Sequence, residues 1–535
     1  MTRKSLPIGI QDFETIRSED FYYVDKTPLI RRLVDGGRFY FLSRPRRFGK
    51  SLLLDTIGTL FAGLETLFAG LDIHEHWNWS VTHPVLRVSF DRKYERPEDI
   101  ERNLNNQLDL IAHSAELGSV CAAGAAPERL QSLLYHLHHK TGQRVVVLVD
   151  EYDKPILDVL GDPDLARANR EYLRSFYGII KGGSKHVRFV FVTGVSMFSK
   201  VNLFSGLNNL KDISLDPRFA TICGYTDTDI DTVFAPELEG LDRDAIRNWY
   251  NGYNWRGEIR LYNPFDVLLL FDEREFKPHW FRTGSPRFLF ETLTKKSVRP
   301  LDLEGRWTDE TLVSKFDVED ISAEALLFQT GYLTIVDEQS DGFDMLYKLD
   351  YPNREVQISL NRGLLQYLGK AVKEAADQGH DLCTLLTAND FEGFAETLKA
   401  YLSSIPYQWT TKGDLARYEA WYAGLLHMSF RAIGVEVRSE DSSSHGRADM
   451  VVLTGEQVFV LEFKMVDTSD TTEAALETAL TQIRNRGYAR KYRNRKEPIH
   501  LIAIACGRDT RNLLDIRVEP AVKNGQVPGT SGTYT

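Results

Sequence analysis

Two short stretches of this 535-residue chain carry side chains whose types and order suit phosphate chemistry. The first is Gly49-Lys50-Ser51, which ends a loop that follows the apolar segment 39–42. Backbone N–H groups at the start of a helix bind anions, a lysine there reaches the β- and γ-phosphates, and a serine hydroxyl binds Mg²⁺. The stretch therefore predicts an ATP site in which Lys50 holds the triphosphate and Ser51 holds the metal.

The loop before Lys50 departs from the phosphate-loop pattern G-x-x-x-x-G-K-[ST], because Arg44 occupies the position of the first glycine. That glycine normally allows a tight backbone turn. Here Arg44, Arg46 and Arg47 would instead add positive charge near a triphosphate. An ordinary basic loop is the alternative interpretation. On the nucleotide interpretation, the contacting residues are Arg44, Pro45, Arg46, Arg47, Phe48, Gly49, Lys50 and Ser51.

A pair of acids follows the aliphatic run 145–149, which is typical of a central parallel strand buried on both faces. Ligands of open α/β sheets bind at the carboxyl ends of such strands. We therefore expect Asp150 to hold Mg²⁺ and Glu151 to orient the attacking water. The next strand-like run ends near Thr193, and Thr193 or Ser196 would sense the γ-phosphate. A helix N-cap with an acid in its first turn is the alternative for Asp150-Glu151.

The second stretch lies near the carboxyl end, where Asp449 is followed about a dozen residues later by Glu462-Phe463-Lys464. Residues i and i+2 of a strand share a face, so Glu462 and Lys464 point one way and Phe463 points into the core. Asp449 begins the preceding strand, and a short hairpin-like loop joins the two. The spacing therefore predicts that Asp449 and Glu462 meet at a strand edge.

Two converging carboxylates make a site for a hard cation such as Mg²⁺, which prefers oxygen ligands. A lysine beside that site, here Lys464, can activate water while the metal stabilises charge on a phosphodiester. The plainer alternative is a Glu462–Lys464 ion pair. Burying charged groups on an apolar strand is costly unless they are paired or bind a metal.

The composition limits the partners and the compartment. A net charge of −11 gives no global attraction to nucleic acid, so any such contact needs a local basic patch. The four cysteines are scattered and show no C-x-x-C spacing, which fits a reducing cytoplasm. There is no N-terminal signal-like run, and no apolar run approaches the roughly 18 residues of a membrane span. We expect a cytoplasmic protein without a membrane partner, and leave a homo-oligomer open.

The chain also resembles a known family over nearly its whole length, to about residue 510. The segments that carry the resemblance are SRPRRFGKS, VLVDEYDKPILD, FVTGVSMFSK, LFSGLNNLKDISLDPRFATICGYT and WYNGYNW. They are similar to AAA-ATPase-like proteins that carry a C-terminal PD-(D/E)XK nuclease-like domain. Asp449, Glu462 and Lys464 match the PD-(D/E)XK constellation. The resemblance implies that an Arg-Pro-Arg-Arg loop replaces the first glycine, and that the cofactors are ATP and Mg²⁺.

Further residue roles come from this resemblance alone. It implies that Glu419 is an upstream acid of the nuclease site and that Gln482, on a helix predicted over 472–486, supports that site. It also implies a lid over 226–300 that closes on the nucleotide. A basic run over 484–496 includes Tyr488 and Tyr492, and cations with aromatic rings suit a nucleic-acid backbone. A solvated basic helix is the alternative for that run.

The length requires several domains, and the predicted fold class is α/β. We expect a P-loop NTPase parallel sheet with a helical lid, followed by a restriction-endonuclease-like α/β domain. The predicted boundaries are 1–225 (ATPase), 226–300 (lid), 301–378 (connecting region, with a small winged-helix-like module as one interpretation), 379–518 (nuclease-like) and 519–535 (disordered tail). Within the connecting region, 325–336 predicts a helix that passes through Gly331 into a strand, and 346–358 predicts a turn between extended pieces.

The function that these features favour is ATP binding and hydrolysis, coupled to Mg²⁺-dependent cleavage of nucleic acid, with DNA preferred over RNA. One alternative is an ATP-dependent molecular switch or scaffold whose nuclease fold is a non-catalytic binding module. Another is a nucleic-acid-binding protein with a degenerate ATPase. ATP hydrolysis and nuclease assays on site variants separate the three.

Overall fold

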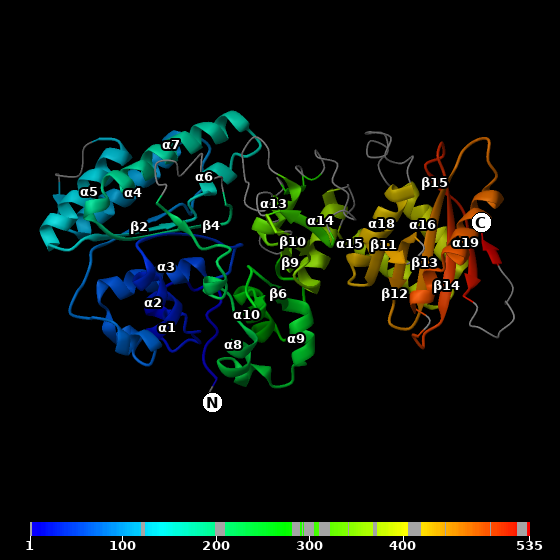
Figure 1. The fold of residues 1–535 in the computed structure, drawn as a ribbon, viewed down its shortest axis with the longest axis horizontal. Coiled ribbons are helices and arrows are strands. Elements are labelled where there is room, and N and C mark those ends of the chain that lie inside the picture. Colours follow the sequence, from blue (N-terminus) through cyan, green and yellow to red (C-terminus); the bar gives the residue numbers. More distant parts are fainter. Residues whose placement is uncertain are drawn as a thin grey trace. The chain divides into compact units, whose positions relative to one another are not determined.

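The computed structural model describes residues 3–118, 124–197, 209–280, 289–290, 293, 304–309, 322–340, 342–367, 372–404, 419–443, 446–492, 494–521 and 532–534. The chain divides into two compact units (Figure 1). The first unit comprises residues 1–279, 287–292 and 305–353, and the second comprises 280–286, 293–304 and 354–535. Both units combine sheets with helices, so the predicted α/β class is confirmed. Among the described residues, no helix has both the length and the apolar character needed to cross a membrane.

A five-stranded parallel sheet forms the centre of the first unit, in the order β2-β3-β4-β1-β5. Its strands are β1 (Phe39–Ser43), β2 (Val85–Ser89), β3 (Val145–Asp150), β4 (Val187–Gly194) and β5 (Lys211–Asp212). Every residue of β3 is buried, as expected for an aliphatic strand covered on both faces. Because β1, β3 and β4 are parallel, their carboxyl ends meet at one edge of the sheet, where ligands of such sheets bind.

Helices cover both faces of this sheet (Figure 1). They are α1 (Phe13–Ser18), α2 (Thr27–Gly36), α3 (Lys50–Ala62), α4 (Pro97–Ser114), α5 (Ala126–Thr141), α6 (Lys154–Leu157) and α7 (Pro163–Gly182). Figure 1 shows α1–α3 on one side of the sheet and α4–α7 on the other. Gly58 lets α3 lie close to the sheet, because a Cβ there would meet Leu148 at 3.2 Å and Val85 at 3.6 Å.

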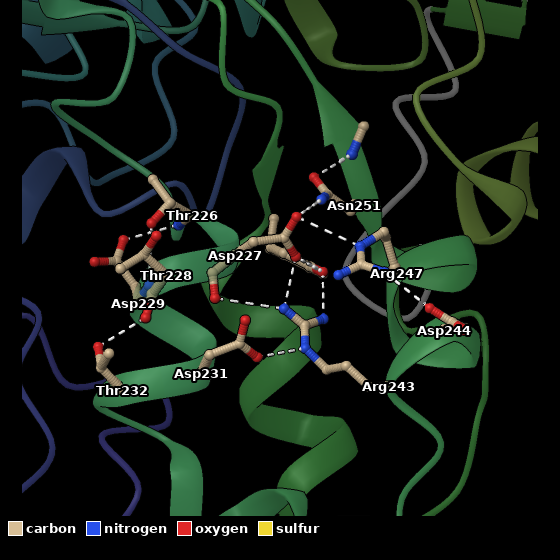
Figure 2. Close-up of polar contacts among 12 residues, drawn as sticks. Thr226, Asp227, Thr228, Asp229, Asp231, Thr232, Arg243, Asp244, Arg247 and Asn251 are labelled. Atoms are coloured by element: carbon tan, nitrogen blue, oxygen red, sulfur yellow. Dashed lines mark hydrogen bonds and ion pairs between the residues drawn. The ribbon is translucent and has the colours of Figure 1, made fainter.

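A small module of helices and a two-stranded sheet follows in the first unit. It contains α8 (Asp227–Thr232), α9 (Arg243–Tyr250), β6 (Asn251–Tyr253), β7 (Leu261–Tyr262) and α10 (Pro264–Glu273). Figure 2 shows polar contacts that join α8, α9 and β6. Asp227 accepts hydrogen bonds from Arg243 and from the Tyr262 hydroxyl, both at 2.6 Å, and Arg243 also pairs with Asp231 at 2.7 Å. One aspartate and one arginine thus connect α8, α9 and β7.

The first unit ends with a three-stranded antiparallel sheet in the order β8-β10-β9. Its elements are β8 (Arg306–Asp309), α13 (Ala323–Thr330), β9 (Thr334–Ser340) and β10 (Met345–Asp350). Gly331 ends α13 in the left-handed conformation, with φ of 86°, before the chain enters β9. The predicted passage from helix through Gly331 into a strand is therefore confirmed.

The second unit is built on a six-stranded sheet whose strand order follows the sequence, from β11 to β16. The strands are β11 (Glu436–Ser443), β12 (Gly446–Leu453), β13 (Val458–Val466), β14 (Ile499–Gly507), β15 (Asn512–Pro520) and β16 (Gly532–Tyr534). The helices are α14 (Arg354–Tyr367), α15 (Val372–Thr387), α16 (Phe391–Ser403), α18 (Glu419–Arg431) and α19 (Thr472–Arg486). Only the β13–β14 pair is parallel among these strands.

The two faces of this sheet have separate cores. Phe459, Leu461 and Phe463 of β13 pack with residues of α16 and α18, while Val458 and Val460 pack with residues of α19. The helix predicted over 472–486 is confirmed by α19.

Two predictions about extended or disordered chain are wrong. The segment after the turn at residues 351–353 is the helix α14, whereas the sequence suggested a second extended piece. In the tail predicted to be disordered, Gly532–Tyr534 pair with β15 as β16. The rest of that tail after Ala521 lies outside the described residues.

Candidate nucleotide and metal sites

Lys50 lies at the first position of α3, directly after Gly49, whose φ of 88° places it in the left-handed region that favours glycine. The Lys50 ammonium is buried and donates hydrogen bonds to the carbonyls of Arg44, at 2.9 Å, and Pro45, at 2.8 Å. Burial lowers the pKa of Lys50, and Asp150 opposes this shift. The loop thus encloses a lysine at a helix N-terminus, as a phosphate site requires.

The three arginines of this loop lie in different environments. Arg44 is fully buried, and its Nη1 donates to the carbonyls of Ser43 and Ser214 at 2.8 Å. Its guanidinium carbon lies 4.2 Å from the ring centre of Trp255. The side chain of Arg44 therefore binds protein groups, which is not the phosphate contact that the sequence suggested.

Arg46 and Arg47 are more accessible. Arg46 is exposed, and its positive charge opposes the rise in the pKa of Glu151 that burial causes. Arg47 stacks on Phe265 of α10, 3.8 Å from the ring centre, and its Nη1 is buried without a hydrogen-bond partner among the described residues. A phosphate oxygen would satisfy that nitrogen, so this loop fits a nucleotide.

The predicted acids lie at the end of β3, near the lysine. Asp150 is buried and accepts a hydrogen bond from the Thr193 hydroxyl at 2.8 Å, so the two predicted cofactor residues are in contact. Glu151 has a φ of 52°, an unusual value for a residue with a side chain. Burial raises the pKa of Glu151, while the charge of Lys50 opposes this effect. Ser51 follows Lys50 in the first turn of α3.

Asp153 was not predicted as a site residue, although it is buried beside these groups. It accepts hydrogen bonds from the backbone N–H of Val195 at 3.1 Å and of Ser196 at 2.6 Å, and also from the Ser196 hydroxyl. Ser196 is thereby turned toward Asp153, whereas Thr193 contacts Asp150. The available signal was an acid two positions after Glu151 in the same acidic segment.

In the second unit, antiparallel pairing brings the predicted carboxylates together. The pair Met450↔Leu461 is followed along both strands by Asp449 and Glu462. Asp449 Oδ2 accepts a hydrogen bond from the backbone N–H of Phe463 at 2.8 Å. Phe463 lies in the core, as predicted, while Glu462 is on the opposite face.

The remaining predicted nuclease residues contact the same group. Lys464 Nζ lies 3.2 Å from Glu462 Oε1 and 3.6 Å from Glu419 Oε2. Gln482 of α19 donates from Nε2 to Glu462 Oε1. Burial alone would lower the pKa of Lys464, but the neighbouring carboxylates of Glu462 and Glu419 outweigh burial and raise that pKa above its usual value. All five predicted residues therefore converge around β13, an interior strand of the sheet.

The donor set at Glu462 fits a divalent cation. Glu462 Oε2 is buried and has no hydrogen-bond partner among the described residues. Burial and the charge of Asp449 raise the pKa of Glu462 to about 7. No cluster of three or more His, Cys, Asp or Glu side chains suited to a metal occurs within the described part of the chain. Two carboxylates with water suffice for Mg²⁺, which commonly binds through one or two carboxylates.

The aromatic residues of the basic run do not form a stacking surface. Tyr488 and Tyr492 are 3% and 2% exposed and belong to the core beside α19. Arg484 pairs with Glu519 at 3.0 Å and with Glu477 at 3.2 Å. The sequence suggested that the cations and aromatic rings of this run suit a nucleic-acid backbone, but the sheet and α19 bury both rings, so neither tyrosine is exposed to such a partner.

Comparison with known proteins identifies both halves of the chain. Residues 7–204 match the family described as "Predicted AAA-ATPase", and residues 417–515 match the "PD-(D/E)XK nuclease superfamily". An uncharacterized protein encoded in the vnfD 5′ region of Azotobacter chroococcum mcd 1 is 50% identical over 522 residues, which cover 97% of this chain and 99% of that protein. The chain belongs to the AAA-ATPase-like proteins that carry a PD-(D/E)XK nuclease domain. No solved structure matches it.

This family assignment agrees with the positions of the two sites. The AAA-ATPase match contains Lys50, Asp150 and Thr193, and the nuclease match contains Glu462 and the four predicted residues around it. The protein thus combines a nucleotide-binding type of domain with a nuclease-like domain.

Proposed function

We propose that this AAA-ATPase-like protein hydrolyses ATP in its first unit, and that ATP controls a Mg²⁺-dependent nuclease in its second unit. The nuclease would cleave phosphodiesters of a nucleic acid, DNA before RNA, in the cytoplasm. The observation that carries the proposal is the convergence of Asp449, Glu462, Lys464 and Gln482, with one buried Glu462 oxygen left unsatisfied. A buried carboxylate oxygen without a partner is costly, and a bound cation would remove that cost.

At the first site, each residue would have a separate task. Lys50 and the backbone of the loop would bind the phosphates, and Glu151 would orient the attacking water. Ser51 and Asp150 would hold Mg²⁺, which neutralises charge on the phosphates. Thr193 fixes one oxygen of Asp150 and leaves the other for the metal.

At the second site, Asp449 and Glu462 would hold Mg²⁺, which stabilises negative charge on the phosphodiester. Lys464 would hold the attacking water, and its ammonium donates to the Phe463 carbonyl at 3.0 Å and to Glu462 Oε1 at 3.2 Å, with Glu419 Oε2 3.6 Å away. Gln482 would keep the Glu462 carboxylate in place through its hydrogen bond.

We also propose that the module from α8 to α10 serves as the lid over the nucleotide. Its support is contact with the loop that precedes Lys50. Phe48 packs edge-on against Tyr253 and Trp255, with ring centres 4.8 and 5.0 Å apart, and Arg47 stacks on Phe265. A movement of the loop on ATP binding would therefore move the residues of this module that contact it.

The test is a nuclease assay on single- and double-stranded DNA and RNA, with and without ATP and Mg²⁺, combined with an ATP hydrolysis assay. Lys464→Ala should abolish cleavage and leave ATP hydrolysis intact, whereas Lys50→Ala should abolish ATP hydrolysis and the effect of ATP on cleavage. Lys399→Ala and Lys181→Ala, exposed lysines on α16 and α7, are the matched controls.

Two outcomes contradict the nuclease proposal. If the Lys464→Ala protein still cleaves nucleic acid, the assignment of the nuclease site to Asp449, Glu462 and Lys464 is wrong. ATP hydrolysis without cleavage of any nucleic acid favours the alternative, an ATP-dependent switch or scaffold whose nuclease fold is a binding module.

A further inference from the structure

Side chains that the proposed mechanism does not yet use hold the segment Val195–Met197, which follows β4. The first is Asp153, whose buried carboxylate accepts hydrogen bonds from the backbone N–H groups of Val195 and Ser196 and from the Ser196 hydroxyl. The Tyr152 hydroxyl also donates to the Ser196 carbonyl, at 2.9 Å. The residues directly after the proposed catalytic acids thus fix the backbone at residues 195 and 196.

A further side chain comes from a distant part of the sequence. Gln329 of α13 is 3% exposed, and its Oε1 accepts a hydrogen bond from the backbone N–H of Met197 at 2.8 Å. These two residues are 132 positions apart and belong to the same unit. The segment after β4 is therefore held at one end by Asp153 and at the other by α13.

The position of this segment matters because it continues directly from Thr193. The Thr193 hydroxyl contacts Asp150, and the Thr193 carbonyl accepts a hydrogen bond from the backbone N–H of Tyr152 at 3.0 Å. A shift of residues 195–197 would therefore move the groups around Asp150 and Glu151. Displacements of about 1 Å at a reacting centre can cost roughly 100-fold in rate.

The helix α13 is connected in turn to the aromatic turn of the lid module. Gly331 ends α13, and Thr334 of the following strand exchanges hydrogen bonds with Asn254, at 2.7 and 3.2 Å. Asn254 lies between Tyr253 and Trp255, the two rings that pack on Phe48 of the phosphate loop. The segment after β4 and the aromatic turn that packs on Phe48 are thus both hydrogen-bonded to residues of the segment 323–334.

We propose that Asp153 and Gln329 are positioning residues for ATP hydrolysis, which hold Val195–Met197 in place. ATP turnover then requires that α13 contacts that segment through Gln329. This inference rests on the proposed ATPase function and goes beyond it by naming the element that the ATP site must contact. A merely structural role would lower stability without separating kcat from KM.

The experiment compares two substitutions at Gln329 in the full-length protein. Gln329→Leu removes the acceptor for the Met197 N–H, whereas Gln329→Glu keeps an oxygen there. Gln329→Leu should lower kcat for ATP about 10- to 100-fold with little change in KM, and Gln329→Glu should restore most of the rate. Gln339→Leu, at an exposed position on β9, is the matched control and should leave both constants unchanged.

Hydrogen exchange provides a second measurement that does not depend on turnover. The Met197 amide should exchange slowly in the wild type and in Gln329→Glu, and about tenfold faster in Gln329→Leu. ATP should slow exchange across residues 323–330 in the wild type but not in Gln329→Leu. Asp153→Asn should also lower kcat, with thermal unfolding as the check that it folds.

The possible failures are distinguishable. Equal ATP hydrolysis by the wild type and Lys50→Ala contradicts the proposed ATPase function. Normal wild-type turnover that Gln329→Leu leaves unimpaired contradicts this inference alone. A parallel loss in Gln329→Leu and Gln329→Glu, with KM raised in both, also contradicts it and indicates a structural role.

Discussion

At the scale of single residues, Arg44 and Arg46 show how two similar side chains of one loop take opposite roles. Arg44 is fully buried and donates to the backbone carbonyls of Ser43 and Ser214. Burial lowers the pKa of Arg44 to about 10, which leaves it charged at neutral pH. Arg46 is exposed near Glu151. The first therefore shapes the loop, while the second is available to a nucleotide.

This contrast gives a paired prediction for the two arginines. Arg44→Ala should lower the free energy of unfolding of the first unit by about 2–4 kcal/mol, because it leaves buried carbonyls unsatisfied and opens a cavity beside Trp255. Arg46→Ala should change it by less than about 0.5 kcal/mol but weaken ATP binding several-fold. Urea unfolding and ATP titration measure both quantities, and a stable Arg44→Ala protein would contradict this view of the loop.

The second prediction concerns pH at the proposed metal site. The pKa of Glu462 is raised to about 7, and a cation must displace its proton. Mn²⁺ affinity, measured by calorimetry, should therefore fall about tenfold per pH unit below 7 and level off above pH 8. Glu462→Gln should bind Mn²⁺ weakly at every pH, and a flat profile for the wild type would contradict the assignment.

The same pKa predicts how stability depends on pH when no metal is present. A carboxyl group whose pKa is raised on folding favours the folded state most at pH values below its unfolded pKa of 4.5. That contribution is lost as the pH rises through about 7. Metal binding should offset the loss, so added Mn²⁺ should stabilise the second unit more at pH 8 than at pH 6.

At the scale of elements, charge pairs of unequal burial join α8, α9 and β6 in the proposed lid (Figure 2). Arg243 contacts Asp227, Asp231 and Tyr262 within 2.7 Å, and its side chain is 22% exposed. Arg247, one turn later, contacts Asp227 at 3.4 Å and Asp244 at 2.8 Å, and its side chain is 46% exposed. The better-buried arginine should therefore carry most of the stabilisation.

This difference gives the third prediction. Arg243→Lys should lower the free energy of unfolding of the first unit by about 1–3 kcal/mol, because an ammonium cannot reproduce the planar contacts of a guanidinium. Arg247→Lys, the matched control, should change it by less than about 0.5 kcal/mol. Thermal unfolding at low and high salt measures both, and equal losses in the two variants would contradict the argument.

The elements were predictable from the sequence wherever periodicity and burial agree. The aliphatic runs of β3 and β4, and the alternation around Glu462, follow from strand geometry, so the meeting of Asp449 with Glu462 was predictable. Arg44 was not, because a charged side chain is normally expected in solvent. The burial of Tyr488 and the contact of Gln329 with Met197 depend on tertiary packing, which one sequence does not reveal.

At the scale of the whole molecule, the chain forms two compact units, each with its own proposed ligand. The fourth prediction is therefore that calorimetry resolves two unfolding transitions. ATP at 100 times its Kd should stabilise only the first unit, by about 2.7 kcal/mol, and so raise the temperature of that transition alone. Mn²⁺ should raise only the transition temperature of the second unit. Lys50→Ala should remove the ATP shift and keep the Mn²⁺ shift. One transition that responds to both ligands would contradict independent unfolding.

The stacking of Arg44 on Trp255 also makes the fluorescence of this tryptophan a probe of the loop that precedes Lys50. An indole beside a cation is sensitive to its electrostatic surroundings, and Trp255 lies 4.2 Å from the Arg44 guanidinium and packs on Phe48. Any rearrangement of the loop on ATP binding should change the emission of this one tryptophan out of eight. The difference in fluorescence between the wild type and Trp255→Phe would then report nucleotide binding in real time, without an attached dye.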